Sequence, residues 1–385
     1  MISVKELIEG EPFKNSLRFL KISEAANVFG DQPFTVVCSE KSRVVAVRIK
    51  DAANGRAKIV EIANNLPAYK KSPFLKGENL LAVGGRDLLS TLRKFCKKGD
   101  NRLIALLLDF SIADAFKKTE LVISKDGAAE KELCPLEEVI VDLKYLINAS
   151  RALFADAFFE CAAISLFKLD SLLLSVAEKS SPPSTIYENA VAELLKNCNE
   201  NNLFSSLICA EIILAKFFYE GGGLISNGLF MVANALKKIE GAASYPECLY
   251  ASAKALVSLY LISTERDLSN SEIMPDYVKR LQGLVDLYGG GPDDFFKDYI
   301  PLSEAAIHSA LSEVSSSKEA KAAALAAKLD LSKTEKVSAL TYSGKKKMAS
   351  FSKADVCFAI KHGGYLSGGY LKYLSDAGIT EAISG

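Results

Sequence analysis

The stretch that decides the predicted fold is residues 153–165, which read LFADAFFECAAIS. Apolar side chains recur in it every three or four residues and leave only a narrow polar edge at Asp156 and Glu160. A helix that is apolar around most of its circumference is buried within a helical stack or under a partner. Residues 203–219 show the same pattern. Both segments therefore predict core helices of a mainly α-helical body.

Helical periodicity extends on both sides of this stretch. It predicts seven helices separated by Pro-, Asn- or Gly-containing breaks, at 136–149, 151–178, 185–197, 203–219, 224–239, 246–263 and 271–288. Short connections favour an antiparallel, tetratricopeptide-like array, although the tetratricopeptide motif itself does not recur. We expect residues 1–330 to form a single helical scaffold domain.

Residues 1–120 mix strand and helix patterns within that domain. Residues 34–38 and 44–49 are rich in β-branched residues and flank a polar turn, so they predict a β-hairpin. Residues 57–62 are a candidate third strand, and residues 103–110 are too short to decide between strand and helix. We expect a small N-terminal hairpin or sheet, and whether it stands apart as a lobe is left open.

Residues 331–385 are predicted to be a polar linker followed by a Gly/Tyr-rich C-terminal arm. The run Lys345 to Lys347 is interpreted as solvated linker, and its contact with anionic lipid is left open. Residues 363–369, GGYLSGG, superficially resemble a phosphate loop, but no suitable strand precedes them. The role of the segment stays open.

Composition argues against several classes of function. Lys plus Arg and Asp plus Glu number 47 each, so no global basic field favours nucleic acid. None of the eight cysteines forms a C-x-x-C pair, and with only His308 and His362 beside them no metal site is predicted. The cysteines instead indicate small apolar residues in a reducing compartment. Without a signal-peptide pattern or a long apolar run, a cytoplasmic protein is expected.

No catalytic set is recognised in the sequence. Neither histidine lies in a nucleophile-elbow pattern, and the chain contains no P-loop and no G-x-G-x-x-G after a strand. The sequence therefore predicts no catalytic residue, no cofactor and no enzyme activity.

Five segments, in order along the chain, carry a family resemblance: LSTLRKF at 89–95, a stretch at 103–116 that ends in DFSIADAF, FECAAI at 159–164, SLICAE at 206–211 and FFKDYIP at 295–301. They resemble the BRO domain, the boomerang-shaped endosomal-sorting domain of ALIX-type and plant BRO-like proteins. The resemblance implies a rigid, non-catalytic scaffold of the ESCRT pathway.

The same resemblance implies a partner and a location. An apolar groove would bind the amphipathic helix of an ESCRT-III subunit, and Phe204, Ile208 and Ile212 would contact that partner, although a core role explains the same apolar stripe. The protein would be endosome-associated, with peripheral membrane association left open. The alternatives are a helical-repeat subunit of another large multiprotein assembly and an enzyme with an unrecognised acid/base site.

Overall fold

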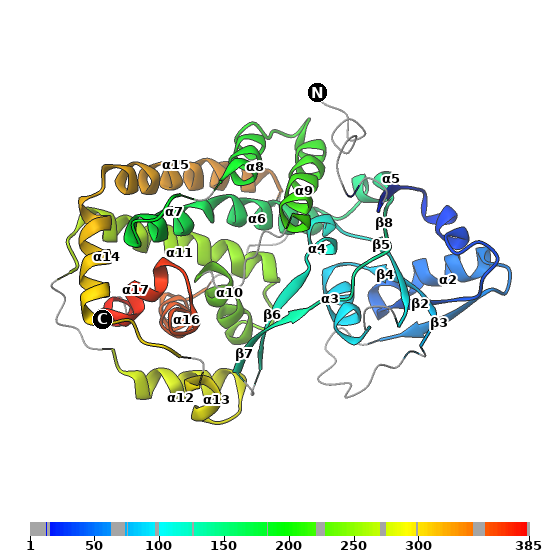
Figure 1. The fold of residues 1–385 in the computed structure, drawn as a ribbon. Helices are drawn as coiled ribbons and strands as arrows, with labels where there is room; N and C mark the ends of the chain where they lie inside the picture. The colour runs from blue at the N-terminus through cyan, green and yellow to red at the C-terminus, as the bar shows by residue number, and fades with distance from the viewer. Residues whose placement is uncertain are drawn as a thin grey trace. The chain divides into compact units, whose positions relative to one another are not determined.

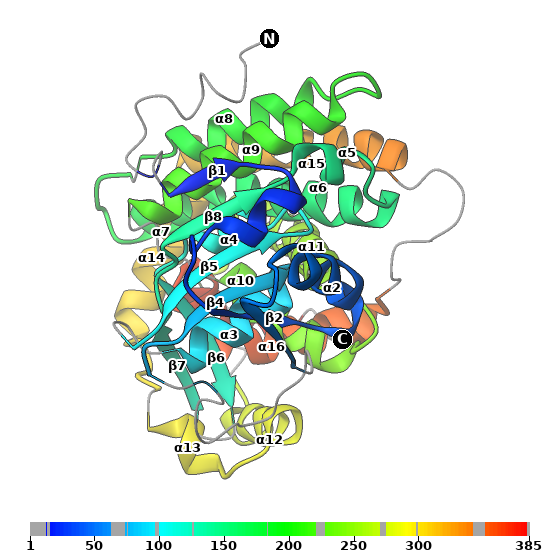
Figure 2. The same ribbon diagram turned by 90° about the vertical axis from the view of Figure 1, so that its right-hand side faces the viewer.

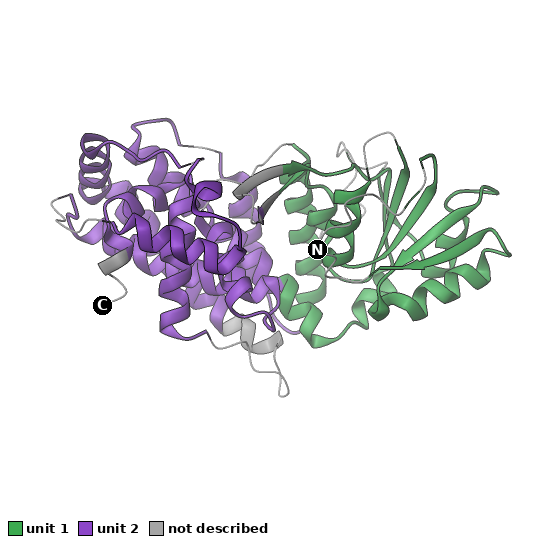
Figure 3. Ribbon diagram, turned by 90° about the horizontal axis from the view of Figure 1, so that it is seen from below, with its two compact units in different colours: residues 1–120, 131–157, 201–223 green, residues 121–130, 158–200, 224–385 purple. Residues whose placement is uncertain are grey.

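The computed structural model describes residues 13, 16–62, 74, 76–96, 100–124, 127–182, 184–220, 228–269, 275–297, 299–341 and 351–382. The chain divides into two compact units, which Figure 3 colours separately. Unit 1 contains Met1–Glu120, Lys131–Ala157 and Asn201–Gly223, and unit 2 contains Leu121–Glu130, Phe158–Glu200 and Leu224–Gly385.

Unit 1 is built around six parallel strands in the order β1-β8-β5-β4-β2-β3. Figure 2 shows the succession from β1 through β8, β5 and β4 to β2. The strands are β1 (Leu17–Phe19), β2 (Phe34–Cys38), β3 (Ala57–Glu61), β4 (Asn79–Gly84), β5 (Arg102–Leu107) and β8 (Glu138–Val141). The helices of the unit include η1 (Ile22–Asn27), η2 (Glu40–Ser42), α2 (Arg43–Ala52), α3 (Arg86–Phe95), α4 (Ile112–Ala115), α5 (Leu143–Ile147) and α9 (Leu203–Tyr219). The central strands are apolar along their length because helices cover the sheet on both faces.

Successive side chains of a strand point to opposite faces of the sheet. Val36, Leu81 and Ile104 lie on the face that packs against η1 and α2 in one apolar cluster. Helix α3 packs against β4, and its buried leucines are not part of that cluster, so it covers the opposite face. Helices on alternate faces follow from right-handed crossovers that run in opposite directions along a sheet.

Residues 44–49, predicted as the second strand of a hairpin, belong to α2. Val45, Ala46 and Ile49 are buried, whereas Val44 is 67% exposed. The β-branched content misled the prediction because strand preference depends on packing context. A parallel pair such as β2 and β3 needs a crossover connection, and α2 provides it. The strand predictions at 34–38 and 57–62 are confirmed.

The prediction of a mainly α-helical, tetratricopeptide-like array is wrong. Residues 103–110 supply the central strand β5, residues 79–84 form an unpredicted strand, and residues 136–149 begin with β8 before the short helix α5. Each of these strands is buried on both faces, so it reads as a continuous apolar run that periodicity cannot tell from a helix.

Unit 2 consists mainly of helices (Figure 1). These are α7 (Lys168–Ala177), α8 (Ile186–Lys196), α10 (Gly228–Ile239), α11 (Tyr245–Glu265), α12 (Tyr277–Tyr288), α13 (Pro292–Phe296), α14 (Glu304–Ser316), α15 (Lys318–Thr341), α16 (Lys353–Leu366), α17 (Tyr370–Asp376) and α18 (Ile379–Ala382). Helix α6 (Arg151–Leu166) carries residues of both units, and β6 (Thr119–Ser124) pairs with β7 (Gly127–Glu132). The helices predicted at 185–197, 203–219 and 246–263 are confirmed to within a few residues, and the one at 151–178 is divided at Phe167. The helix predicted at 224–239 is confirmed over 228–239, and residues 224–227 lie outside the described residues.

The C-terminal helices are tied to α12 by a buried arginine. The guanidinium of Arg280, 0% exposed, donates to Oγ of Ser375 at 2.7 Å and to Oγ1 of Thr380 at 3.1 Å. The division of the chain at residue 330 stays a prediction, and Lys345 to Lys347 lies outside the described residues.

All eight cysteines lie among the described residues and are free thiols. Seven are buried and Cys209 is half-buried, so they pack as small apolar side chains, as predicted. No helix in the described part of the chain is long and apolar enough to cross a membrane.

Candidate functional site

Among the described strands, the sheet of unit 1 has one place where the direction of winding reverses. From β2 the chain passes through α2 to β3 on one side, and from β4 it passes through α3 to β5 on the other. The two strands are neighbours, with Thr35 opposite Leu80 and Cys38 opposite Val83. Ligands of open parallel sheets bind in the crevice outside the carboxyl ends of two such strands. The segments that follow β2 and β4 are therefore the first candidates for a site.

Strand β4 ends in a glycine pair that leads directly into α3. Gly85 precedes the helix in an extended conformation, with φ −110° and ψ −161°. A Cβ atom on Gly85 would lie 1.9 Å from Oδ2 of Asp109, and one on Gly84 would lie 2.6 Å from Cδ2 of Leu88. Close approach therefore favours glycine at both positions. A strand, a tight glycine turn and a helix N-terminus are the parts of an anion-binding site.

The Asp109 carboxylate lies at the start of α3. Its Oδ2 atom accepts a hydrogen bond from the backbone N–H of Arg86, and its Oδ1 atom accepts one from the N–H of Ser111, both at 3.1 Å. The Ser111 hydroxyl also donates to Oδ1. Burial raises the pKa of Asp109, against the hydrogen bonds from Ser111 and the charge of Arg86. The carboxylate thus occupies the position of an anion at this helix N-terminus.

A cluster of buried charges continues from the start of α3 to α4. Asp114 accepts hydrogen bonds from Nε of Arg86 and Nζ of Lys117. Burial alone would raise the pKa of Asp114, but the two cations lower it to about 2. Glu211 of α9, 0% exposed, accepts a hydrogen bond from the N–H of Ala113 at 3.0 Å and also interacts electrostatically with Arg86. Two cations and three carboxylates therefore interact within a single buried network.

Arg93 of α3 fixes the backbone around this network. Its guanidinium donates to the carbonyl oxygens of Cys134 at 2.7 Å, Asp114 at 3.0 Å and Lys117 at 2.6 Å. Burial lowers its pKa to about 10, so the side chain remains a cation at neutral pH. The α4 segment is thereby held against α3, which keeps Asp114 beside its partners.

The carboxyl end of β2 carries two buried hydroxyl groups. The N–H of Ser39 donates to Oγ of Ser42 at 3.0 Å, and the two Oγ atoms lie 3.3 Å apart. The η2 turn that contains Ser42 packs against β4. The Ser42 hydroxyl also donates to the carbonyl oxygen of Ser39 at 3.3 Å, so the two side chains hold the η2 turn at the end of β2.

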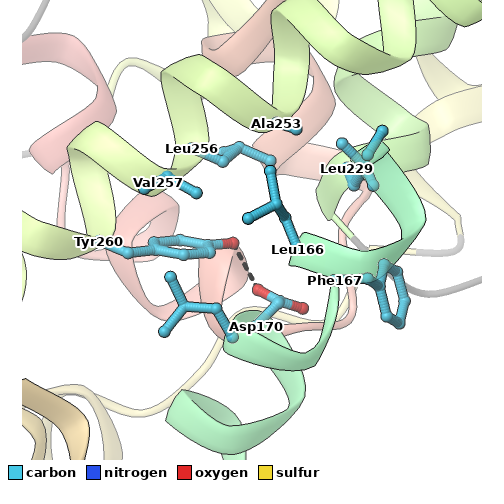
Figure 4. A pocket seen from close by; sticks show the side chains of 10 residues that line it. Leu166, Phe167, Asp170, Leu229, Ala253, Leu256, Val257 and Tyr260 are labelled. Atoms are coloured by element: carbon cyan, nitrogen blue, oxygen red, sulfur yellow. Dashed lines mark hydrogen bonds between the residues drawn. The ribbon is translucent and has the colours of Figure 1, made fainter. Parts of the chain in front are cut away.

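Unit 2 contains a pocket of its own between α6, α7, α10 and α11 (Figure 4). Its walls are mainly apolar and include Leu166, Leu229 and Leu256, whereas Asp170 and Tyr260 supply its polar groups. The cavity volume is about 20 Å³, which is the room that one water molecule needs. The pocket is therefore too small for a substrate in this conformation.

Asp170 supplies the carboxyl group that lines this pocket. Its Oδ1 atom accepts a hydrogen bond from the Tyr260 hydroxyl, and the backbone N–H groups of Tyr370 and Leu371 also donate to the carboxylate. A Cβ atom on Gly369 would lie 2.1 Å from Oδ2. Burial raises the pKa of Asp170 to about 6, against these hydrogen bonds. The carboxylate therefore serves the first turn of α17, which is a structural role.

Known proteins resemble this chain in structure but not in sequence. No family model matches the chain, and no curated protein matches it. The iron-containing alcohol dehydrogenase from Corynebacterium glutamicum superposes with a TM-score of 0.50 at 11% identity, covering 96% of this chain and 94% of that one. The sulfoacetaldehyde reductase from Bifidobacterium kashiwanohense, solved with NAD+, gives 0.50 at 11% identity, covering 97% and 98%. The aldehyde reductase YqhD from E. coli gives 0.50 at 12% identity, covering 96% and 98%. At these identities the similarity establishes the fold alone.

These comparisons correct the reading of the chain as a BRO domain. The fold is the one seen in those dehydrogenases and reductases, with a parallel sheet that a helical scaffold lacks. The non-enzymatic ESCRT scaffold and the ESCRT-III helix as its partner rested on that resemblance, and both predictions are wrong. The endosomal association rested on the same resemblance and loses its basis. Of the alternatives, the helical-repeat subunit is wrong for the same reason, and the enzyme is the alternative that remains. The cytoplasmic location stays a prediction.

The name of one of these structures raises the question of an iron site. Among the described residues, no group of three or more His, Cys, Asp or Glu side chains could hold a metal ion. His308 lies on α14, with Nε2 3.9 Å from Glu304, and His362 lies on α16, with Nδ1 3.1 Å from the carbonyl oxygen of Arg280. The two histidines thus have separate surroundings, and the described part of the chain does not fit iron.

The three predicted partner-binding residues lie along α9. Ile208 and Ile212 are 0% and 2% exposed, and the half-buried ring of Phe204 lies 6.0 Å from that of Phe110. A binding role for these three residues stays a prediction, but the ESCRT-III helix is no longer the expected partner.

The sequence interpretation missed the glycine turn and its carboxylate. Residues 79–85, NLLAVGG, are an apolar run that ends in two glycines, and the amphipathic run 86–95 follows at once. A strand, glycines and a helix in this order are the signal for a phosphate-binding turn. The same residues 89–95 were interpreted as a helix of the BRO domain. No local pattern marks Asp109, because only the sheet brings it to the start of α3.

Proposed function

We propose that this chain is an oxidoreductase that binds a nicotinamide dinucleotide in unit 1 and acts on an alcohol or an aldehyde. The observation that carries the proposal is the reversal of winding between β2 and β4, where Gly84 and Gly85 at the carboxyl end of β4 lead into α3. Dinucleotides place their pyrophosphate at such a helix start, because free N–H groups and the helix dipole favour anions. The fold shared with two aldehyde reductases, one solved with NAD+, supports this reading.

Three features of the chain suit a dinucleotide. Gly85 lets the backbone come close to a phosphate, and Arg86 adds a positive charge in the first turn of α3. Ser39 and Ser42 offer hydroxyl groups at the end of β2. A nicotinamide cofactor supplies hydride transfer when it is bound, and the protein supplies binding and orientation. Because the described residues do not fit iron, we expect turnover that a chelator does not abolish.

The test is a titration of the whole chain with NADH and NADPH, followed by nicotinamide fluorescence. The chain contains no tryptophan, which removes the main overlapping protein emission. We expect saturable binding that is about tenfold weaker in Gly85→Ala, because a Cβ atom there disturbs the turn. Gly241→Ala is the matched control, since a Cβ atom on Gly241 meets nothing within 4 Å. Thermal unfolding of both variants separates lost binding from lost structure.

Turnover is then measured with a panel of alcohols and aldehydes, with and without a chelator, by nicotinamide absorbance. Failure of the folded wild-type chain to bind either dinucleotide at millimolar concentration contradicts the proposal. Binding without turnover across the panel contradicts the oxidoreductase part, and activity lost on chelation contradicts the metal-free part.

A further inference from the structure

The start of α3 already holds an anion that belongs to the chain. Oδ2 of Asp109 accepts the Arg86 N–H at 3.1 Å. The same atom lies where a side chain on Gly85 would begin, because a Cβ atom there would be 1.9 Å from it. The carboxylate therefore covers both the glycine surface and the first helical N–H group, which are the two features that a phosphate uses at a helix N-terminus.

The cation of the same turn is also engaged. Nε of Arg86 donates to Asp114, and Glu211 adds a further negative charge to its surroundings. Arg86 therefore faces three carboxylates, with Lys117 as a second cation on Asp114. A phosphate that entered this network would bring negative charge next to Asp109 in a region sheltered from water, where like charges repel strongly.

We infer that Asp109 is a built-in competitor for the phosphate of the dinucleotide, which must displace this carboxylate from Gly85 and Arg86 before it binds. The inference rests on the proposed function, because it states how dinucleotide binding at the same glycine turn is regulated. The hydrogen bonds from Ser111 hold the carboxylate in the blocking position. The dinucleotide affinity of the wild-type chain is therefore lower than it would be if Asp109 did not occupy the glycine turn.

The test compares NADH binding by Asp109→Asn and by Asp87→Asn. The amide in Asp109→Asn would keep the shape and one acceptor oxygen but lose the charge, so we expect this variant to bind at least about tenfold more tightly than wild type. Asp87 is exposed in the first turn of the same helix, so Asp87→Asn makes the same change of net charge near α3. We expect its affinity to stay within about threefold of wild type, as screening by solvent requires.

A second measurement uses the wild-type chain and needs no variant at Asp109. NAD+ should bind more tightly as the pH falls, because protonation removes the charge of Asp109, whose pKa burial raises. Of the charged groups around it, Arg86 and Lys117 are cations, and Asp114, with a pKa of about 2, keeps its charge until much lower pH. Glu211 is the remaining carboxyl, and Glu211→Gln measures its share of the pH dependence.

The outcomes separate the two proposals. Wild-type binding that neither tightens in Asp109→Asn nor depends on pH overturns the competitor role and leaves the proposed function standing. Absence of dinucleotide binding by the folded wild-type chain at millimolar concentration overturns the proposed function itself. Equal tightening in Asp109→Asn and Asp87→Asn reduces the effect to net charge and also overturns the competitor role.

Discussion

Unit 1 and unit 2 each bury an aspartate, and the two carboxyl groups behave in opposite ways. Asp114, 9% exposed, lies against Arg86 and Lys117, and their charges lower its pKa to about 2 against the effect of burial. Asp170, 5% exposed, is held by neutral donors such as the Tyr260 hydroxyl, and burial raises its pKa to about 6. Equal burial therefore does not decide whether a carboxyl group is charged; the available partners decide it.

The same difference in partners suggests different roles for the two regions. Side chains of both charges lie near the carboxyl end of β4, so a charged ligand can exchange ion-pair partners there. The helical pocket of unit 2 is apolar and tolerates one carboxyl group only because hydroxyl and backbone N–H groups satisfy it. The first region suits binding, and the second suits structural support.

The largest expected effect on stability comes from removing the positive charge of Arg86 at the start of α3. Arg86→Met leaves Asp114 with Lys117 alone and removes the positive charge near Asp109, so we expect the free energy of unfolding to fall by about 3–5 kcal/mol. Arg102→Met is the control, because Arg102 pairs with Glu137 on the surface with its side chain 48% exposed, and we expect a loss of at most about 1 kcal/mol. Urea unfolding measures both. Similar losses in the two variants would show that the buried network is worth no more than a surface pair.

The next effect is the pH dependence that Asp170 gives to unit 2. Its pKa is about 6 in the folded chain and 3.8 as the ordinary value, so between these pH values the folded form keeps a proton that the unfolded form has released. Stability from this group is full below pH 4 and is lost as the pH rises through 6, by about 3 kcal/mol. The free energy of unfolding is measured at a series of pH values for the wild type and for Asp170→Asn, and the difference between the two curves isolates the pH dependence that Asp170 contributes. A flat difference curve would mean that Asp170 is already charged at pH 4.

Asp114 should show the opposite slope. Because its folded pKa of about 2 lies below the ordinary value of 3.8, its stabilisation is full above pH 4. That contribution is lost as the pH falls through 2, by about 2.5 kcal/mol. In Lys117→Met, one of the two cations is gone, so the folded pKa of Asp114 should rise, and the loss of stability should be smaller and complete at a higher pH than in wild type. An unchanged acid limb in this variant would exclude Lys117 as a cause of the low pKa.

The smallest effect concerns the neutral donor of the pocket. Tyr260→Phe removes the hydroxyl that donates to Asp170, so we expect a loss of about 1–2 kcal/mol and a further rise in the pKa of Asp170. Tyr373→Phe is the control, since its hydroxyl donates over 3.3 Å to the exposed Glu178, and it should cost less than about 0.5 kcal/mol. A carbon-detected NMR titration of the aspartates reports the pKa directly. An unchanged value for Asp170 would assign its shift to burial alone.

The sequence predicted individual elements better than their assembly. Helices such as 185–197 and 246–263 were found because apolar residues that repeat every three or four positions, and the breakers between helices, are local properties. The strand predicted at 44–49 was wrong, because strand preference depends on packing: in helix α2 the side chains of Val45 and Ile49 are buried, whereas Val44 and Val47 are exposed. The five segments that suggested a BRO domain are short, and in the structure they include both strand and helix, as in 103–116.

The candidate site depended on pairings that no local pattern carries. Strand β4 pairs with β2 and β5, and β8 pairs with β1 across more than a hundred residues of chain. Those pairings bring Asp109 to Gly85 and Arg86, although 23 residues separate Arg86 from Asp109 in the chain. Sequence alone could have marked the glycine turn, but not the carboxylate that fills it.

By itself, the sequence determined that the chain has a large apolar interior, many amphipathic helices, free cysteines that pack as apolar side chains and no helix for a membrane in its described part. These properties follow from the composition and from apolar residues that repeat every few positions, and both can be read from short stretches of the chain. Only the tertiary structure decided that the apolar runs at 79–84, 102–107 and 138–141 are parallel strands. It also decided at which pair of strands the winding direction reverses, and which buried carboxyl groups lie next to a cation. The reason is that parallel pairing and the pKa of a buried group both depend on partners distant in sequence.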